Sequence, residues 1–258
     1  MQLKKIIKLI EDNAPKCYAS HWDNVGLMLG DVEQEIKKIM LTLDVTPQVT
    51  DEAIANECDL IISHHPFFFS EIKTIDFSTP YGKMIKNLIT NNIAVFSCHT
   101  NMDSAECGIN AVLSEKFELS DVEVLEKNET FSEVGIGRIG NICECTLDEI
   151  CQMTKKILNA STLRVIADDM DKQIKKVCVA SGSCGDLIGI AKSKSADVFI
   201  TADVKYHQAL DASYSDIAVI DAGHYYTEFL VTDIFKSILE NIDAEIFISS
   251  QKDCFRFI

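Results

Sequence analysis

Residues 37–66 read KKIMLTLDVTPQVTDEAIANECDLIISHHP, and this stretch decides the fold. Residues 39–43 and 60–63 form apolar runs that predict two buried strands, and residues 48–57 predict a helix that joins them. Strands that are apolar along their whole length and alternate with helices are typical of an α/β protein. The stretch therefore predicts a strand–helix–strand unit whose second strand runs directly into His64, His65 and Pro66.

The same pattern returns later in the chain. The pair Lys-Lys before a strand and the Asp that opens the next strand, 22 residues on, both recur 138 residues further along. A third pair of similar strands is offset by 124 residues, so the second copy is about 14 residues shorter. The matching segments are 37–39 with 175–177, 59–63 with 197–201, and 93–96 with 217–220. The sequence thus predicts an α/β protein with two related lobes.

The remaining elements follow from the same periodicities. Further strands are expected at residues 94–97, 177–180, 198–201 and 217–220, and further helices at residues 1–13, 82–91, 185–194 and 225–241. We interpret residues 122–142 as the crossing from one lobe to the other. Its Gly-x-Gly-Arg at 135–138 does not precede a helix, which argues against a dinucleotide-binding loop. The expected lobes are residues 1–125 with 222–258, and residues 126–221.

Composition and charge narrow the possible partners. The formal net charge is −16, with 24 basic against 40 acidic residues, so we do not expect binding to a nucleic-acid backbone. No apolar run reaches the ~18 residues of a membrane helix, and we expect a cytoplasmic protein without membrane contact. The ten scattered cysteines are expected to be reduced thiols. Cys143 and Cys145 form the single close pair, which is a weak zinc signal.

Polar side chains with metal-binding chemistry follow the expected strand ends, where ligands of open α/β sheets bind. His64 and His65 follow one strand and Asp103 lies shortly after another. His224 and Glu228 stand four residues apart, which places both on one face of a helix. Three imidazoles and two carboxylates suit zinc, iron, manganese, cobalt or nickel better than calcium or copper(I). The sequence therefore predicts a metal site made by these five residues.

Each of these residues also has a simpler interpretation. A lone histidine at a strand end is more often a hydrogen-bonded core residue, and we favour that role for His99 taken by itself. A glutamate four residues after a histidine is usually part of a solvated helix face. The metal site is favoured because several such groups occur together at strand ends. His207 can equally line the site or be structural.

The motifs SHHPFFF (63–69), HTNMD (99–103) and GHYYTE (223–228) resemble those of the Nif3-like proteins, which are also named homologues of the type 2 GTP cyclohydrolase I. WDNVGL (22–27) and TADVKYH (201–207) fit as well, so the resemblance covers essentially the whole chain. It implies a dinuclear metal site in the cleft between two α/β lobes and a ring-shaped homohexamer. It also implies that His65 and Asp103 hold one ion, that His64 and His224 hold the other, and that Glu228 bridges both.

The resemblance and the metal site together suggest a hydrolase that acts on a nucleotide or a related phosphorylated small molecule. Lys205 and His207 are candidates for proton transfer, and we expect substrate contacts from Asp23, Asn24, His99 and Tyr206. Longer relatives carry an inserted domain for which this chain has no room. Ala202 stands where the family often has Gly. The alternative function is a non-catalytic, metal-binding ring that regulates or binds a partner, and DNA binding through the ring is disfavoured by the charge.

Overall fold

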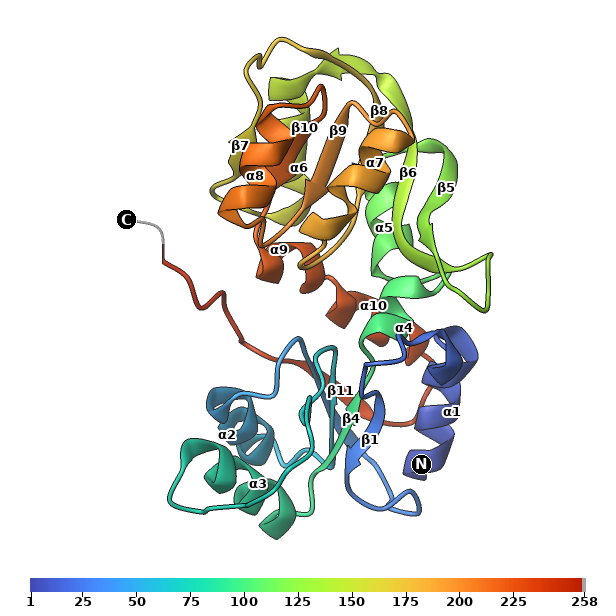
Figure 1. The fold of residues 1–258 in the computed structure, drawn as a ribbon. Coiled ribbons are helices and arrows are strands. Elements are labelled where there is room, and N and C mark those ends of the chain that lie inside the picture. The colour runs from blue at the N-terminus through green and yellow to red at the C-terminus, as the bar shows by residue number, and fades with distance from the viewer. Residues whose placement is uncertain (257–258) are drawn as a thin grey trace. The chain divides into compact units, whose positions relative to one another are not determined.

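A computed structural model describes residues 1–256 of the chain, which divides into two compact units (Figure 1). Unit 1 comprises residues 1–102 and 231–252, and unit 2 comprises residues 103–230 and the described residues from 253 onward. This division differs from the expected boundaries. Helix α5 (Ile109–Lys116) packs on strands β6 (Gly135–Thr146) and β8 (Gln173–Val179), so residues 103–125 belong to unit 2.

Unit 1 is built on a five-stranded sheet in the order β1-β4-β3-β2-β11. Strands β2, β3, β4 and β11 are parallel, and β1 pairs with β4 in the antiparallel direction. The parallel strands are short and mostly apolar, as the sequence predicts for strands covered on both faces. Their bounds are Gly26–Leu29 (β1), Lys38–Thr42 (β2), Leu60–Ser63 (β3), Ala94–Ser97 (β4) and Glu245–Ile248 (β11).

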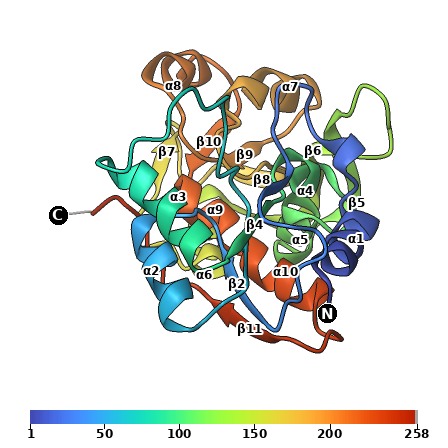
Figure 2. The same ribbon diagram turned by 90° about the horizontal axis from the view of Figure 1, so that it is seen from below.

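Helices cover both faces of this sheet: α2 and α3 lie on one side, α1 and α10 on the other (Figures 1 and 2). Met40, Ile61 and Val95 point from neighbouring strands into the core beneath α2 and α3. Both of these helices begin with a threonine cap followed by proline, a combination that fixes a helix start. The helices of this unit are α1 (Leu3–Asn13), the 3₁₀ turn η1 (Lys16–Tyr18), α2 (Pro47–Ala55), α3 (Pro80–Thr90) and α10 (Val231–Ile238). The short α4 (Thr100–Ser104) spans the boundary to unit 2.

Unit 2 contains a six-stranded mixed sheet in the order β5-β6-β8-β9-β10-β7. Strands β8, β9 and β10 are parallel, whereas β5, β6 and β7 pair in the antiparallel direction. Residues 122–142, expected to be a crossing, instead form most of the β5–β6 hairpin. The glycines of this segment had suggested a connection between the two lobes. They are needed for a different reason, because at Gly135 and Gly140 the backbone of strand β5 approaches too closely to leave space for a side chain. The remaining bounds are Ser120–Lys127 (β5), Arg164–Ile166 (β7), Val198–Thr201 (β9) and Ala218–Asp221 (β10).

Helices also cover both faces of the second sheet. Helices α5 and α6 (Leu147–Leu158) contact β6 and β8 on one face, and α7 (Ile188–Ser193) and α8 (Tyr206–Ser213) lie on the other (Figure 2). The 3₁₀ turn η2 (Gly185–Leu187) leads into α7, and α9 covers His224–Glu228. The expected single helix over residues 225–241 is therefore two helices, α9 and α10. The break falls where the chain leaves unit 2 for unit 1, which the continuous apolar periodicity does not reveal.

The internal repeat predicted from the sequence is matched by equivalent hydrogen bonds. In unit 1 the Asp59 carboxylate accepts from the backbone amides of Lys37 and Lys38, at 2.7 and 3.0 Å. In unit 2 the Asp197 carboxylate accepts from the two residues at the same spacing, Lys175 and Lys176, at 2.8 and 2.9 Å. The two units are thus related α/β folds in which one aspartate ties together the starts of two neighbouring parallel strands. Among the described residues, no helix is both long enough and apolar enough to cross a bilayer.

Candidate metal centre

Three histidines gather at the carboxyl ends of β3 and β4 in unit 1. The two strands are parallel neighbours with Ser63 opposite Ser97, so the residues that follow them come close together. His64, His65 and His99 each offer a ring nitrogen, and these atoms lie within 4.8 Å of one another. The geometry of one sheet edge therefore brings His99 close to two residues that lie 34 and 35 positions before it in the chain.

Each of these three histidines has its Nδ1 atom held by an oxygen acceptor. His64 Nδ1 lies 2.9 Å from the carbonyl oxygen of Cys98, and His65 Nδ1 lies 2.7 Å from Asp44 Oδ1. Gln251 in turn donates to Asp44 Oδ2 at 2.7 Å and accepts from the Asp44 amide at 3.0 Å. Because a carbonyl or carboxylate accepts from Nδ1–H, the neutral ring keeps its lone pair on Nε2, the form in which histidine binds metal.

His99 has a different carboxylate partner, Asp23, whose Oδ1 lies 2.9 Å from His99 Nδ1. The other oxygen of Asp23 accepts from the amide and the hydroxyl of Thr100, at 3.0 and 2.5 Å. Burial by itself would raise the pKa of Asp23, but the hydrogen bond and charge of His99 and the hydrogen bonds of Thr100 lower it from 3.8 to about 2. Asp23 thus remains a carboxylate and fixes the orientation of His99.

Unit 2 places His224 and Glu228 together on α9, as their spacing predicts. His224 Nε2 lies 2.8 Å from Glu228 Oε2, and His224 Nδ1 lies 2.7 Å from Asp203 Oδ2. Both ring nitrogens therefore face carboxylate oxygens. A neutral imidazole can donate to only one of them, so the pair of contacts needs a further proton, on the ring or on a carboxyl group, or a metal ion held by Nε2 and the glutamate.

The loop after β8 contacts the other predicted ligand of unit 2. Ser181 Oγ lies 3.4 Å from Asp103 Oδ1, and Asn110 joins the two residues by donating to the Asp103 carbonyl and accepting from the Ser181 amide. Gly182 follows, with a φ of +65°, and a Cβ built on it would lie 2.0 Å from Glu228 Oε1. The loop therefore makes room for the Glu228 carboxylate and places Asp103 beside it.

The predicted proton carriers lie at the start of α8. Lys205 precedes the helix, and its amide donates to Gln208 Oε1 at 2.8 Å. Lys205, Tyr206 and His207 are all exposed, and the Tyr206 and His207 rings are in edge contact. They follow Asp203, the partner of His224, by only two to four residues. The structure thus leaves their side chains accessible to solvent.

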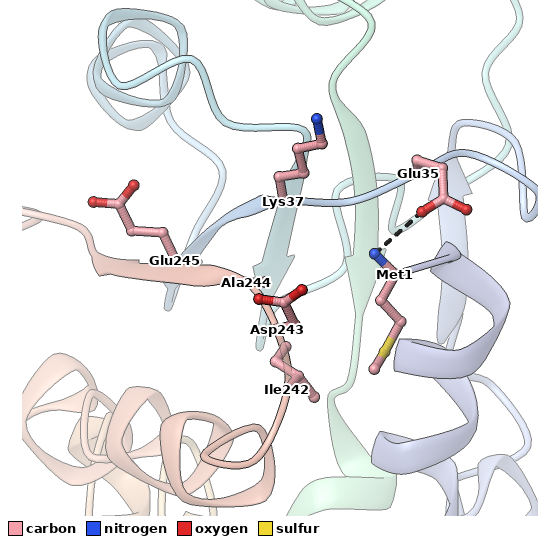
Figure 3. Close-up of a pocket in the computed structure, with 7 residues that line it drawn as sticks. All are labelled: Met1, Glu35, Lys37, Ile242, Asp243, Ala244 and Glu245. Atoms are coloured by element: carbon pink, nitrogen blue, oxygen red, sulfur yellow. Dashed lines mark ion pairs between the residues drawn. The ribbon is translucent and has the colours of Figure 1, made fainter.

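A polar hollow of about 540 Å³ lies elsewhere in unit 1 (Figure 3). It is lined by Met1, Glu35, Lys37 and residues 242–245, and the N-terminal ammonium pairs with Glu35 at 3.2 Å. These residues stand at the amino ends of β2 and β11, whereas the histidines follow the carboxyl ends of β3 and β4. Ligands of open α/β sheets bind at the carboxyl ends, so this hollow is separate from the candidate centre.

Sequence reasoning missed three residues that organise the predicted ligands: Asp44, Gly182 and Asp203. Asp44 and Asp203 each follow a strand closely, which is the same signal that revealed the histidines. An aspartate after a strand is common in turns, however, so the signal has little weight without a known partner. Nothing in the sequence marks Gly182 as part of the site. Its importance comes from the position of Glu228 in the folded chain, which leaves no space for a side chain at residue 182.

The ligand atoms that the histidines and carboxylates of each unit offer determine which metal ions can bind there. Imidazole nitrogens with fixed Nδ1–H groups, set beside carboxylates, form the histidine–carboxylate arrangement of zinc and other first-row transition metals. The sequence profile of Duf34/NIF3 (NGG1p interacting factor 3) matches residues 1–254. The chain belongs to this family. Its predicted resemblance to Nif3-like proteins is therefore confirmed.

Relatives and solved structures agree with the Duf34/NIF3 assignment. A Clostridium perfringens protein named GTP cyclohydrolase 1 type 2 homolog is 38% identical over 100% of both chains. One of the same name from Clostridium acetobutylicum is 39% identical over 93% of this chain and 90% of its own. Reduced HcgD from Methanocaldococcus jannaschii matches with a TM-score of 0.86 and 32% identity, covering 97% and 98% of the two chains. A Bacillus cereus protein related to NIF3 has the same fold, with a TM-score of 0.92 at 24% identity over 100% of this chain and 99% of its own.

Proposed function

We propose that this NIF3 protein is a hydrolase that depends on two divalent ions, of iron, zinc, manganese, cobalt or nickel. Its substrate is a nucleotide or a related phosphorylated small molecule, in keeping with the cyclohydrolase name of its relatives. The proposed ligands are His65 and Asp103 for one ion, His64 and His224 for the other, and Glu228 for both.

One observation carries the proposal: His64, His65 and His224 each have Nδ1 bound to a carbonyl or carboxylate oxygen, at 2.7–2.9 Å. Fixing Nδ1 in this way leaves the Nε2 lone pair of each ring pointing in a set direction, which is what a metal ligand requires. His99 is held in the same way by Asp23, but the proposed ligand set leaves it for substrate contact. The space left by Gly182 for the Glu228 carboxylate supports the same interpretation.

Divalent ions, when bound, supply Lewis acidity and make water nucleophilic at neutral pH. The chain must then orient the substrate and carry protons. Asp23 orients His99, and we assign His99, Asn24 and Tyr206 to substrate contact. Lys205 and His207 are exposed near Asp203 and are the proposed proton carriers. The resemblance also leads us to propose a ring-shaped homohexamer, which light scattering can test.

The function is tested by screening metal-loaded protein against nucleoside triphosphates, following both phosphate and formate release. Glu228→Gln should bind less metal and lose turnover, because a neutral amide is a poor bridging ligand. Glu129→Gln, an exposed glutamate of the β5–β6 turn, should behave as wild type. Turnover that persists in metal-depleted Glu228→Gln would contradict the metal-dependent mechanism. Stoichiometric metal without turnover of any nucleotide would favour the alternative, a non-catalytic metal-binding ring.

A further inference from the structure

Two exposed aromatic side chains stand beside the histidine cluster of unit 1. Trp22 is 54% exposed and Phe69 is 58% exposed, and their ring centroids are 6.0 Å apart. The His99 ring lies 6.1 Å from Trp22 and 6.4 Å from Phe69, edge-on to both. Three rings from three separate loops therefore converge on one place, which we call the aromatic platform.

The platform is held in position by its neighbours in the chain. Asp23, next to Trp22, binds His99 and Thr100, and it also accepts from the Asn24 amide at 2.8 Å. The Asn24 side chain donates to the carbonyl oxygen of Phe68, the residue before Phe69. The loops that carry Trp22 and Phe69 are thus tied to each other and to β4. Rings fixed in advance lose little conformational entropy when they bind a ligand.

The chemistry of the platform indicates a planar aromatic ligand. Stacking of a heterocyclic base on an aromatic side chain contributes about 1–3 kcal/mol per base and depends little on which base it is. The imidazoles of His64 and His65 have ring centroids 5.1 and 5.5 Å from that of His99, so a ring bound on the platform would lie next to the proposed metal ligands of unit 1. An aliphatic ligand would gain free energy from burial of its apolar surface, but it would lack the stacking interaction with the aromatic rings.

We propose that Trp22, Phe69 and His99 bind the planar heteroaromatic ring of the substrate, in the manner of a nucleobase held against aromatic side chains. This assignment rests on the proposed function, because it takes the neighbouring histidines as the reaction site. It adds that the heteroaromatic ring of the substrate binds to unit 1, on residues that are not metal ligands.

Trp22 is the single tryptophan of the chain, so its fluorescence reports on the platform alone. The protein is titrated with guanosine, adenosine, GTP and ATP, and with ribose 5-phosphate and inorganic phosphate as ligands that lack a base. We expect saturable quenching by the nucleosides and nucleotides and none by the ligands without a base. Phe69→Ala should weaken the base-dependent affinity by about 5- to 100-fold, the equivalent of one lost stacking contact.

Phe77→Ala is the matched control, because Phe77 is a 52% exposed aromatic of the same loop region that takes no part in the platform. It should leave the affinity unchanged. Repeating the titration after chelation separates the two proposals: quenching that survives metal removal supports the platform even if hydrolysis is never found. Absence of saturable quenching by every base, or equal affinity of Phe69→Ala and wild type, would overturn the proposal. So would a blue shift of Trp22 emission that depends on protein concentration alone, since a second copy would then cover the rings.

Discussion

Replacing Gly182 by alanine tests how the Glu228 carboxylate is held. The new Cβ would lie 2.0 Å from Glu228 Oε1 and 3.5 Å from His224 Nε2. To reach ordinary contact the carboxylate must withdraw by about 1.4 Å, a displacement of the size that disables a preorganised site. Glu228 ends a flexible side chain and can move, so the protein should still fold.

We expect Gly182→Ala to lower both the stability of the protein and its metal affinity, and the two effects can be measured independently. The φ of +65° at this position costs an alanine roughly 1 kcal/mol of unfolding free energy. Displacement of the ligand should lower metal affinity by about 10- to 100-fold, or roughly 1.4–2.7 kcal/mol of binding free energy. Urea unfolding of the metal-free protein measures the first effect. Titration with zinc or manganese, followed calorimetrically, measures the second.

Gly189→Ala is the control for this substitution. Gly189 lies within α7 and a Cβ built there meets no atom within 4 Å. Alanine should therefore raise the stability by about 0.5–1 kcal/mol, the ordinary gain for glycine in a helix, and leave metal binding unchanged. Equal metal affinity and stoichiometry in Gly182→Ala and wild type would refute the view that this loop makes room for a metal-binding Glu228.

Three further predictions concern stability, each measured by urea unfolding. The pKa of Asp23 is lowered to about 2, so the Asp23 carboxylate stabilises the fold fully above about pH 4 and loses this effect as the pH falls towards 2. The contribution to the unfolding free energy is at most about 2 kcal/mol and is reduced by solvent screening. Asp23→Asn should abolish this part of the pH dependence. Arg138→Met should cost about 3 kcal/mol, because the buried guanidinium donates to the carbonyl oxygens of four residues, including Ser104 and Ala105; a loss below about 0.5 kcal/mol would show that these bonds contribute nothing. Thr146→Ala should cost about 1 kcal/mol by removing the capping box of α6, and an unchanged midpoint would contradict that role.

The sequence predicted the buried parallel strands, because such a strand is apolar along most of its length, but it missed β11, whose first and last residues are exposed. Strands β3, β4 and β9 have the expected bounds. The hairpin of β5 and β6 was misread, since β5 is largely exposed and β6 carries three glycines. Long antiparallel strands with one solvent-exposed face lack the continuous apolar run by which buried parallel strands are recognised.

The sequence indicated the residues that we propose as ligands, but it did not indicate the residues that hold them in place. Histidines after strand ends are rare enough to stand out, whereas Asp44 and Asp203 resemble ordinary turn residues. The contact of Gly182 with Glu228 joins positions 46 residues apart. The aromatic platform likewise depends on loops that meet only in the folded chain, although Trp22 and Phe69 lie in motifs that the sequence had already singled out.

The most direct test of the account is the metal content of the untagged protein, purified without added metal or chelator and measured by elemental mass spectrometry. We predict about two equivalents of a transition metal per chain, as a two-metal site requires. His65→Ala and His224→Ala should each lose metal, and His21→Ala, an exposed histidine outside the cluster, should not. Less than about half an equivalent in wild type, with no uptake on incubation with zinc, iron or manganese, would contradict the central claim.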